Sequence, residues 1–374
     1  MREGWTYKKL VDECAILYGY PFDSKNFSSS NEDMPLVRIR DVKEGATSTY
    51  YKGEYPKEYI IHKGDFLIGM DGEFNISPWQ SDDALLNQRV CKIASKSSDV
   101  LMRYVYRFLV KELKKIEDET PFVTVKHLSA KKLNQIKLPI PPLSEQERIV
   151  SELDLLSSII EKKKAQLKEY DQLAQSIFYD MFGDPIENPK GWELKKLGEV
   201  CEYAKTRINS NDISIENYIG VENLLQKCQG RVLATKVPED LGLTEYIEGD
   251  VLIGNIRPYL KKIWLADCRG GCNGDVLTIR RKKQHEKDVD TIYLFKCLST
   301  NLFFDFAMQY AKGEKMPRGD KKEIMKYPIS LPPLSLQQSF AEKIGAIEKA
   351  KKLIRKTMVG TRILFNYTMD KYFG

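Results

Sequence analysis

Apolar residues recur at alternating spacings of four and three positions between residues 149 and 181. This spacing is typical of a helix that buries one narrow stripe against a partner helix. The stripe has one charged member, Lys163, and predicts a long helix over residues 144–183. Its members are Ile149, Leu153, Leu156, Ile160, Lys163, Leu167, Tyr170, Ala174, Ile177 and Met181.

The same stripe returns 191 positions later and predicts a second long helix over residues 335–374. Both helices follow a proline-rich start, LPIPPLSEQERIV at residues 138–150 and LPPLSLQQSFAEKI at residues 331–344. Proline excludes helix just before the serine of each start and so marks the first turn. The second stripe contains Phe340, Ile344, Ile347, Lys351, Ile354, Met358, Thr361, Phe365, Thr368 and Tyr372.

We expect the two long helices to pair as an antiparallel coiled coil. About 38 residues at 1.5 Å per residue make a rod of about 57 Å, which is too long for an ordinary amphipathic helix on the surface of its own domain. The first helix carries 5 basic and 8 acidic residues and the second carries 8 and 3, so their net charges of −3 and +5 attract. Lys163 and Lys351 on the seam, and Gly345 and Gly360 in the second helix, weaken a closed two-helix rod. They indicate that other helices complete the packing.

The segments before the helices also repeat. GWTYKKLVDEC (4–14) matches GWELKKLGEVC (191–201), and EYIIHKGDFLIG (58–69) matches EYIEGDVLIG (245–254), where a Gly-Asp turn feeds a buried strand. β-rich runs and one amphipathic helix follow in each half, over residues 100–116 and 289–308.

The chain is therefore predicted to be an α+β protein with a pseudo-two-fold internal repeat. Two similar mixed α/β domains are expected to be separated by the coiled coil, and the unlike loops on a shared framework suggest two readers with different targets. The predicted segments are a first domain (1–143), a first helix (144–183), a second domain (184–334) and a second helix (335–374).

Composition narrows the setting of this fold. The 374 residues contain no apolar run of about 18 residues and no secretory signal, so we expect a cytoplasmic protein with no membrane partner. The seven cysteines are scattered, which favours free thiols over disulfides. The one close pair, Cys268 and Cys272, lacks a second pair at zinc-ligand spacing, and we expect no metal site.

Net charge is compatible with nucleic-acid binding, and the absence of known motifs argues against most classes of enzyme. A charge of +6 permits nucleic-acid binding without demanding it. The chain has no glycine-rich nucleotide loop and no phosphate loop, and NPKGW (188–192) is not the Asn/Asp-Pro-Pro-aromatic element of a DNA methyltransferase. Asp71, Glu73 and Asp250 follow turns, where acidic residues are commonplace. We expect no catalytic residue.

The repeated starts, the helix end IFYDMFGDPIENPKGWE (177–193), the segment GDVLIGNIRPYLKK (249–262) and the Gly-Trp openings resemble the specificity subunit of type I restriction-modification systems over essentially the whole chain. The resemblance implies two target recognition domains that each read one half of a split, asymmetric sequence in double-stranded DNA. It also implies helices that set the spacer and dock two modification subunits, through which restriction subunits bind. S-adenosylmethionine, ATP and Mg would then serve the partner subunits, with no cofactor here. The second helix start has Leu336-Gln337 where the first has Glu145-Gln146, which puts equal docking on both sides in doubt.

Base recognition favours Arg or Lys for guanine and Asn or Gln for adenine, on loops held by a rigid frame. The divergent segments after the strands therefore supply the candidates, although any one of them is otherwise a solvated side chain or a turn-capping amide. The other functional class left open is a coiled-coil scaffold whose two globules bind proteins. The DNA-binding candidates are Arg38, Arg40, Asn75, Gln80, Asn87, Gln88, Arg89, Arg207, Asn209, Asn255, Arg257, Tyr259, Lys261, Lys262, Arg318 and Lys321.

Overall fold

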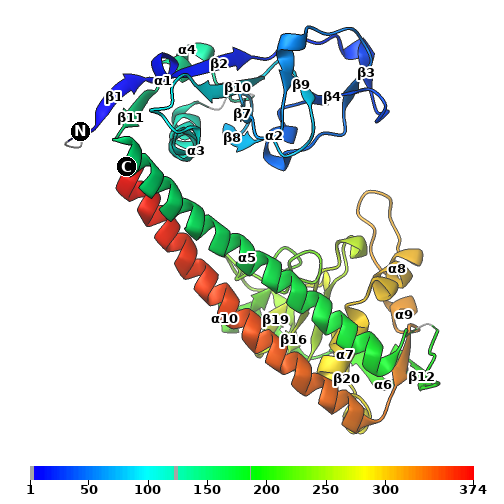
Figure 1. Cartoon of the computed structure of the whole chain (residues 1–374). Helices are drawn as coiled ribbons and strands as arrows, with labels where there is room; N and C mark the ends of the chain where they lie inside the picture. The colour runs from blue at the N-terminus through cyan, green and yellow to red at the C-terminus, as the bar shows by residue number, and fades with distance from the viewer. Residues whose placement is uncertain (1–3, 122–124, 186) are drawn as a thin grey trace. The chain divides into compact units, whose positions relative to one another are not determined.

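The computed structural model describes residues 4–121, 125–185 and 187–374, so the first three residues and Ile186 of the junction motif lie outside it (Figure 1). The chain forms two compact units. The first comprises Met1–Lys163 and Lys356–Gly374, and the second comprises Lys164–Arg355. The units cut across the predicted segments, because α5 (Leu143–Phe182) and α10 (Leu334–Phe373) each give one half to each unit.

The first unit contains a two-stranded ribbon, β1-β11, and a four-stranded antiparallel sheet in the order β2-β10-β7-β8. A second sheet has the order β3-β5-β4-β9-β6. The strands are β1 (Thr6–Lys9), β2 (Cys14–Tyr18), β3 (Phe27–Ser28), β4 (Met34–Val37), β5 (Tyr50–Tyr51), β6 (Ile60–Ile61), β7 (Phe66–Gly69), β8 (Asn75–Pro78), β9 (Ala84–Leu86), β10 (Val90–Ser95) and β11 (Lys137–Ile140). The helices other than α5 and α10 are α1 (Leu10–Glu13), α2 (Asp41–Glu44), α3 (Met102–Glu119) and α4 (Ala130–Asn134).

The second unit repeats this plan with the ribbon β12-β21, the antiparallel sheet β13-β20-β17-β18 and the smaller sheet β14-β16-β19-β15. Both copies therefore confirm the α+β class. The strands are β12 (Glu193–Lys196), β13 (Cys201–Tyr203), β14 (Arg207–Asn209), β15 (Tyr218–Ile219), β16 (Gly242–Tyr246), β17 (Val251–Gly254), β18 (Ile263–Leu265), β19 (Gly270–Cys272), β20 (Val276–Arg281) and β21 (Pro328–Leu331). Its own helices are α6 (Leu197–Val200), α7 (Thr291–Leu298), α8 (Asn301–Gln309) and α9 (Lys321–Ile324).

The repeated Gly-Asp turns carry the same hydrogen bonds in both units. Gly64 and Gly249 have φ of 94° and 88°, a conformation that glycine adopts at little cost. The carboxylate of Asp65 accepts a hydrogen bond from the backbone N–H of His62, and that of Asp250 accepts one from Ile247. Each carboxylate also pairs at 2.7 Å with a cation on the central strand, Lys92 on β10 or Arg280 on β20. The predicted turn into a buried strand is confirmed in both halves.

A buried glutamine fastens each long helix to its domain. The Gln146 amide donates to the carbonyls of Asp99 and Pro141 and accepts from the N–H of Leu101. Gln337, at the equivalent position 191 residues later, makes the same three bonds to Asp288, Pro332 and Asp290. The two helix starts are thus alike at this position, and the substitution of Leu336 for Glu145 leaves the attachment intact.

One predicted helix is wrong in detail. Residues 289–308 were expected to form a single helix, but α7 ends at Leu298 and α8 begins at Asn301. The Thr300 hydroxyl accepts a hydrogen bond from the N–H of Phe303 and so caps a new helix. Apolar residues occur on both sides of the break, and both short helices bury residues in the same core.

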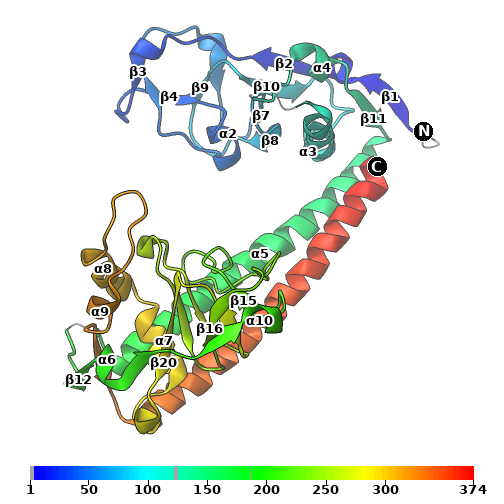
Figure 2. The same cartoon turned by 180° about the vertical axis from the view of Figure 1, so that it is seen from behind.

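Within each unit, the halves of α5 and α10 lie side by side and run in opposite directions, as both Figure 1 and Figure 2 show. In the first unit, Arg148 donates to the Tyr372 hydroxyl and Lys163 donates to the Thr361 hydroxyl. In the second unit, the ammonium of Lys351 lies 2.7 Å from the carboxylate of Asp171. The antiparallel pairing therefore holds in both.

Burial varies among the residues of the predicted seam. Ile149, Leu153, Leu156, Phe340, Ile344 and Ile347 are buried, whereas Ile160, Leu167, Ile177, Ile354, Met358 and Phe365 are half-buried. Lys351, which was expected to weaken the seam, is only 6% exposed and pairs with both Asp171 and Glu348. A charged group at one seam position favours a single register over shifted pairings.

Different side chains anchor each domain to the helices. In the first unit, the guanidinium of Arg107 on α3 lies 2.5 Å from the carboxylate of Asp154 on α5, and Phe108 packs on Phe373 of α10. In the second unit, an aromatic cluster replaces the ion pair. That cluster comprises Phe178, Phe182, Tyr293 and Phe340.

Candidate nucleic-acid interface

The loop that follows β7 in the first unit and the loop that follows β17 in the second unit are held by the same hydrogen bonds. In the first unit, the N–H of Gly72 donates to the carbonyl of Lys126, and the N–H of Leu128 donates to Met70. In the second unit, the N–H of Arg257 donates to Pro317, and that of Gly319 donates to Asn255. Met70 therefore corresponds to Asn255, Gly72 to Arg257 and Leu128 to Gly319.

The charges at corresponding positions beside this loop differ between the two units. The carboxylate of Asp71 contacts His127 and lies 3.6 Å from the guanidinium of Arg89. In the second unit, Arg318 takes the place of His127 and pairs at 3.2 Å with Asp275. Arg89 and Asp275 correspond, because their carbonyls accept from the equivalent N–H groups of Met70 and Asn255. A cation in one unit thus stands where an anion stands in the other.

The loop after β4 or β15 provides a second matched site. The N–H of Arg38 donates to the side chain of Asp41, and the N–H of Gly220 donates to the side chain of Asn223, both at 2.8 Å. Arg38 therefore corresponds to Gly220, and Arg40, two residues on, corresponds to Glu222.

A third pair of corresponding positions carries unlike side chains, at the start of β8 in the first unit and just before β18 in the second. Asn75 pairs with Gly69, and Lys262 bonds to the equivalent Gly254, so Asn75 and Lys262 correspond. The ammonium of Lys262 donates to the carbonyl of Val221 at 2.6 Å. Burial lowers the pKa of Lys262 below its usual value, although the nearby carboxylate of Glu222 acts in the opposite direction.

In the first unit, these loops enclose a cleft of about 470 Å³. The ammonium of Lys43 on α2 and the carboxylate of Glu73 form an ion pair of 2.6 Å. The amide oxygen of Asn75 is buried and has no hydrogen-bond partner among the residues that the structure describes. The cleft therefore presents both donors and acceptors, which suits the edge of a base pair. Its lining residues are Arg38, Ile39, Arg40, Lys43, Glu44, Asp71, Glu73 and Asn75.

In the second unit, exposed side chains gather around η4 (Pro258–Leu260). Arg257 and Tyr259 are exposed on either side of Pro258. Lys261 bonds to the side chain of Asn301 at 2.6 Å. Lys321 lies at the start of α9, and Arg318 lies on the loop just before it. These predicted residues come together around one loop.

Other predicted residues are engaged within the fold. Asn87 is buried, and its side chain accepts from the N–H of Gln88. Asn209 caps η3 (Ser210–Asp212), and Arg207 donates to Thr244 on the neighbouring strand. Gln80 donates to the carbonyl of Pro78. Their structural roles account for these residues without DNA, and their contacts with DNA stay predictions.

Sequence reasoning did not include Lys43, Glu44 or Glu222 among the site residues. Lys43 and Glu44 lie on α2, a single helical turn with no periodic signal in the sequence. Glu222 lies in a segment where insertions had shifted the repeat, so its correspondence to Arg40 depends on the matched hydrogen bonds.

Among residues 4–121, 125–185 and 187–374, no cluster of three or more His, Cys, Asp or Glu side chains is arranged to hold a metal ion. Cys272 is buried in β19, and burial raises the pKa of its thiol to about 11. In the same part of the chain, no helix is long and apolar enough to cross a membrane.

Comparison with known proteins gives matches in both halves. Residues 2–169 and 189–358 match the family model of the type I restriction modification DNA specificity domain. The chain is 40% identical over 173 residues to the type I restriction enzyme EcoBI specificity subunit of Escherichia coli, a match that covers 46% of this chain and only 36% of that protein. Identity to the EcoDI specificity subunit of the same organism is 23% over 358 residues, covering 83% of this chain and 78% of that protein.

A solved structure shares the fold. The type I restriction-modification S subunit from M. genitalium superimposes with a TM-score of 0.60 at 12% identity, over 99% of this chain and 96% of that one. The family model covers most of the sequence in two copies. The chain therefore belongs to the family of type I restriction-modification DNA specificity subunits.

Proposed function

We propose that the chain is the DNA sequence-specificity subunit of a type I restriction-modification complex, and that each unit reads one half of a bipartite, asymmetric target. One observation carries the proposal. The two units share a hydrogen-bonded loop framework, yet residues at corresponding loop positions differ in charge, as at Arg40 and Glu222 or at Arg89 and Asp275. A common frame with exchanged polar groups suits two readers of unlike sequences.

The chemistry of these positions fits recognition of base edges. Arginine and lysine donate to guanine, carboxylates accept from cytosine, and asparagine pairs with adenine. The cleft of the first unit holds all three kinds of side chain, among them Arg38, Glu73 and Asn75. Lys43, which also lines the cleft and has an exposed side chain, suits a phosphate contact, which orients the protein without reading sequence.

The helices are proposed to set the spacer between the half-sites and to dock two modification subunits. In the first unit, the outer face of the helix pair exposes large apolar side chains, including Ile363 and Tyr367, which is 66% exposed. In the second unit, Leu173 and Leu353 are exposed. In the described part of the chain, no atom beyond the neighbouring residues and the nearby backbone of the same helix lies within 4 Å of the position that a Cβ would take at Gly345 or Gly360. Such apolar surface on a helix pair suits a protein partner.

Catalysis is assigned to the modification and restriction subunits rather than to this chain. S-adenosylmethionine would serve the modification subunits, and ATP and Mg would serve the restriction subunits that bind through them. The loops of this chain would place the DNA relative to those active sites. A scaffold that only binds proteins would have no need for differently charged loops on a shared frame.

Salt dependence distinguishes a DNA reader from a protein scaffold. We expect the chain with its modification subunits to bind random duplex DNA, and affinity to fall by about 10³- to 10⁵-fold between 50 and 200 mM salt if six to ten phosphates are contacted. Fluorescence anisotropy with a labelled duplex measures this fall. Affinity that is undetectable at both salt concentrations would favour the scaffold.

A further inference from the structure

The loop from Asn255 to Lys262 is held in an unusual backbone conformation. Arg257 and Lys261, which flank η4, both have φ of 53°, in the left-handed region. Lys227 and Cys228 have φ of 56° and 57°, and their N–H groups donate to the carbonyls of Leu260 and Lys261. Four of the seven non-glycine residues with positive φ in the described chain therefore meet at this loop.

The first unit shows what this position demands of the backbone. Gly72, which corresponds to Arg257, has φ of 73°. Glycine adopts this conformation freely, whereas a residue with a Cβ is disfavoured there. The left-handed turn is thus a property of the shared framework, and the second unit carries arginine where glycine would relieve the strain.

The first residue of the same loop, Asn255, is a second destabilising feature. Asn255 is 7% exposed, and its amide oxygen is buried without a hydrogen-bond partner among the described residues. The first unit fills this position with Met70, which is 6% exposed, and covers it with Leu128. In the second unit, glycine replaces that leucine, and a Cβ at Gly319 would lie 2.9 Å from the Asn255 oxygen. A buried, unsatisfied acceptor destabilises the fold.

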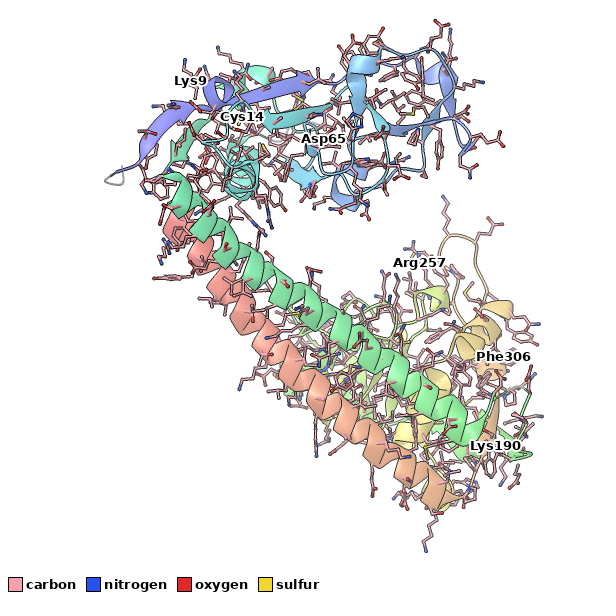
Figure 3. All side chains as sticks on the ribbon, in the orientation of Figure 1. Lys9, Cys14, Asp65, Lys190, Arg257 and Phe306 are labelled. Carbon is pink, nitrogen blue, oxygen red and sulfur yellow. The ribbon has the colours of Figure 1, made fainter. Side chains whose placement is uncertain are left out.

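Neither feature stabilises the domain, and the first unit shows that the framework forms without them. Conformational strain and unpaired polar groups of this kind concentrate at functional sites. The Arg257 side chain extends outward from its loop in Figure 3, and no hydrogen bond or ion pair to its guanidinium occurs among the described residues. Asp275, whose carbonyl accepts from the N–H of Asn255, pairs with Arg318 through its carboxylate.

The neighbours of Arg257 define the chemistry of its ligand. Lys261, Lys262 and Arg318 outnumber the two neighbouring carboxylates, Glu222 and Asp275, so the surroundings are net positive and the ligand offers hydrogen-bond acceptors. A phosphate would be served by any flexible cation and would not require a strained backbone. Guanine presents two acceptors, O6 and N7, which a fixed guanidinium meets in a bidentate manner.

We propose that the Asn255–Lys262 loop is a preorganised guanine reader, with Arg257 donating to O6 and N7 of a guanine in the second half-site. The assignment rests on the proposed DNA-reading function and adds to it the base and the half. Its signature is a trade-off: removal of the Arg257 side chain relieves strain and removes recognition at the same time.

The test uses the full chain with its modification subunits and a duplex selected for tight binding. Arg257→Gly should raise the melting temperature of the chain by a few degrees, because the left-handed residue becomes glycine. It should also lower affinity for the selected duplex by about 10- to 100-fold, while binding to random duplex changes by less than about threefold. In the wild-type chain, 7-deazaguanine at the contacted base, which lacks the N7 acceptor but keeps O6, should cause part of this loss, and the same replacement should cause no loss in Arg257→Gly.

Lys227→Gly is the matched control. It removes a left-handed residue and one positive charge beside the same loop, and it should raise the melting temperature without losing guanine discrimination. An equal loss by Arg257→Gly on selected and random duplexes would assign Arg257 to a phosphate and overturn the proposal, and a lowered melting temperature would overturn it too. A wild-type chain with no sequence preference in either half would instead defeat the proposed function itself.

Discussion

A chain that lacks one heptad from each long helix should recognise the same two half-sites with a shorter spacer between them. Lys163 contacts Thr361, so the facing heptads are residues 160–166 and 358–364. Removing both keeps the two stripes in register and shortens the pair by about 10.5 Å, at 1.5 Å per residue. That length equals about three base pairs of 3.4 Å. The spacer is measured by binding selection from duplexes in which the spacer length varies.

The control keeps the length of the helices and alters their surface. Arg362→Gln changes an exposed side chain in the same heptad and should leave the preferred spacer unchanged. If the double deletion retains the wild-type spacer, the helices do not set it.

Phe340→Ala should destabilise the second unit by about 3 to 5 kcal/mol, the usual loss for a buried phenylalanine. Phe340 is fully buried, and its ring centroid lies 5.7 Å from that of Phe178 and 5.2 Å from that of Phe182. The cluster joins α5, α7 and α10, so the cavity would loosen the attachment of the domain to both helices. Urea unfolding of the full chain measures the loss.

Leu353→Ala is the matched control on the same helix. Leu353 is 62% exposed, and its truncation should change stability by no more than about 0.5 kcal/mol. A loss below about 1 kcal/mol for Phe340→Ala would mean that the aromatic cluster does not hold the domain.

Features that depend on neighbouring residues in the sequence were predictable. The four-three spacing from Ile149 gave the long helices because helical periodicity is local. The Gly-Asp turns were predictable for the same reason, since glycine at positive φ and an aspartate that accepts from the backbone act within four residues. The antiparallel pairing followed from helix length and opposite charge.

Features that depend on contacts distant in sequence were not predictable. The break at Thr300 is an exception, because its signal is local: Ser299, Thr300 and Asn301 interrupt the apolar residues, and the Thr300 hydroxyl accepts from the N–H of Phe303. The prediction of one helix over residues 289–308 overlooked this cap. Lys351 was expected to weaken the seam, since the sequence did not place Asp171 beside it.

The candidate site was only partly visible in the sequence. Arg257 stood out by its place before Pro258, but its left-handed backbone required the structure. The correspondence of Arg40 and Glu222 was hidden because insertions change the offset of the repeat between the Gly-Trp openings and the Gly-Asp turns. Matched hydrogen bonds restored it.

The most direct test of two separate readers is to exchange residues at one matched site. In the full complex, Arg38→Gly with Arg40→Glu gives the first unit the residues that the second unit carries at positions 220 and 222. The bound motif is determined by selection from duplexes in which both half-sites are randomised. We predict that the preferred bases change in one half-site and stay the same in the other. A change in both half-sites, or in neither, would contradict the assignment of one half-site to each unit.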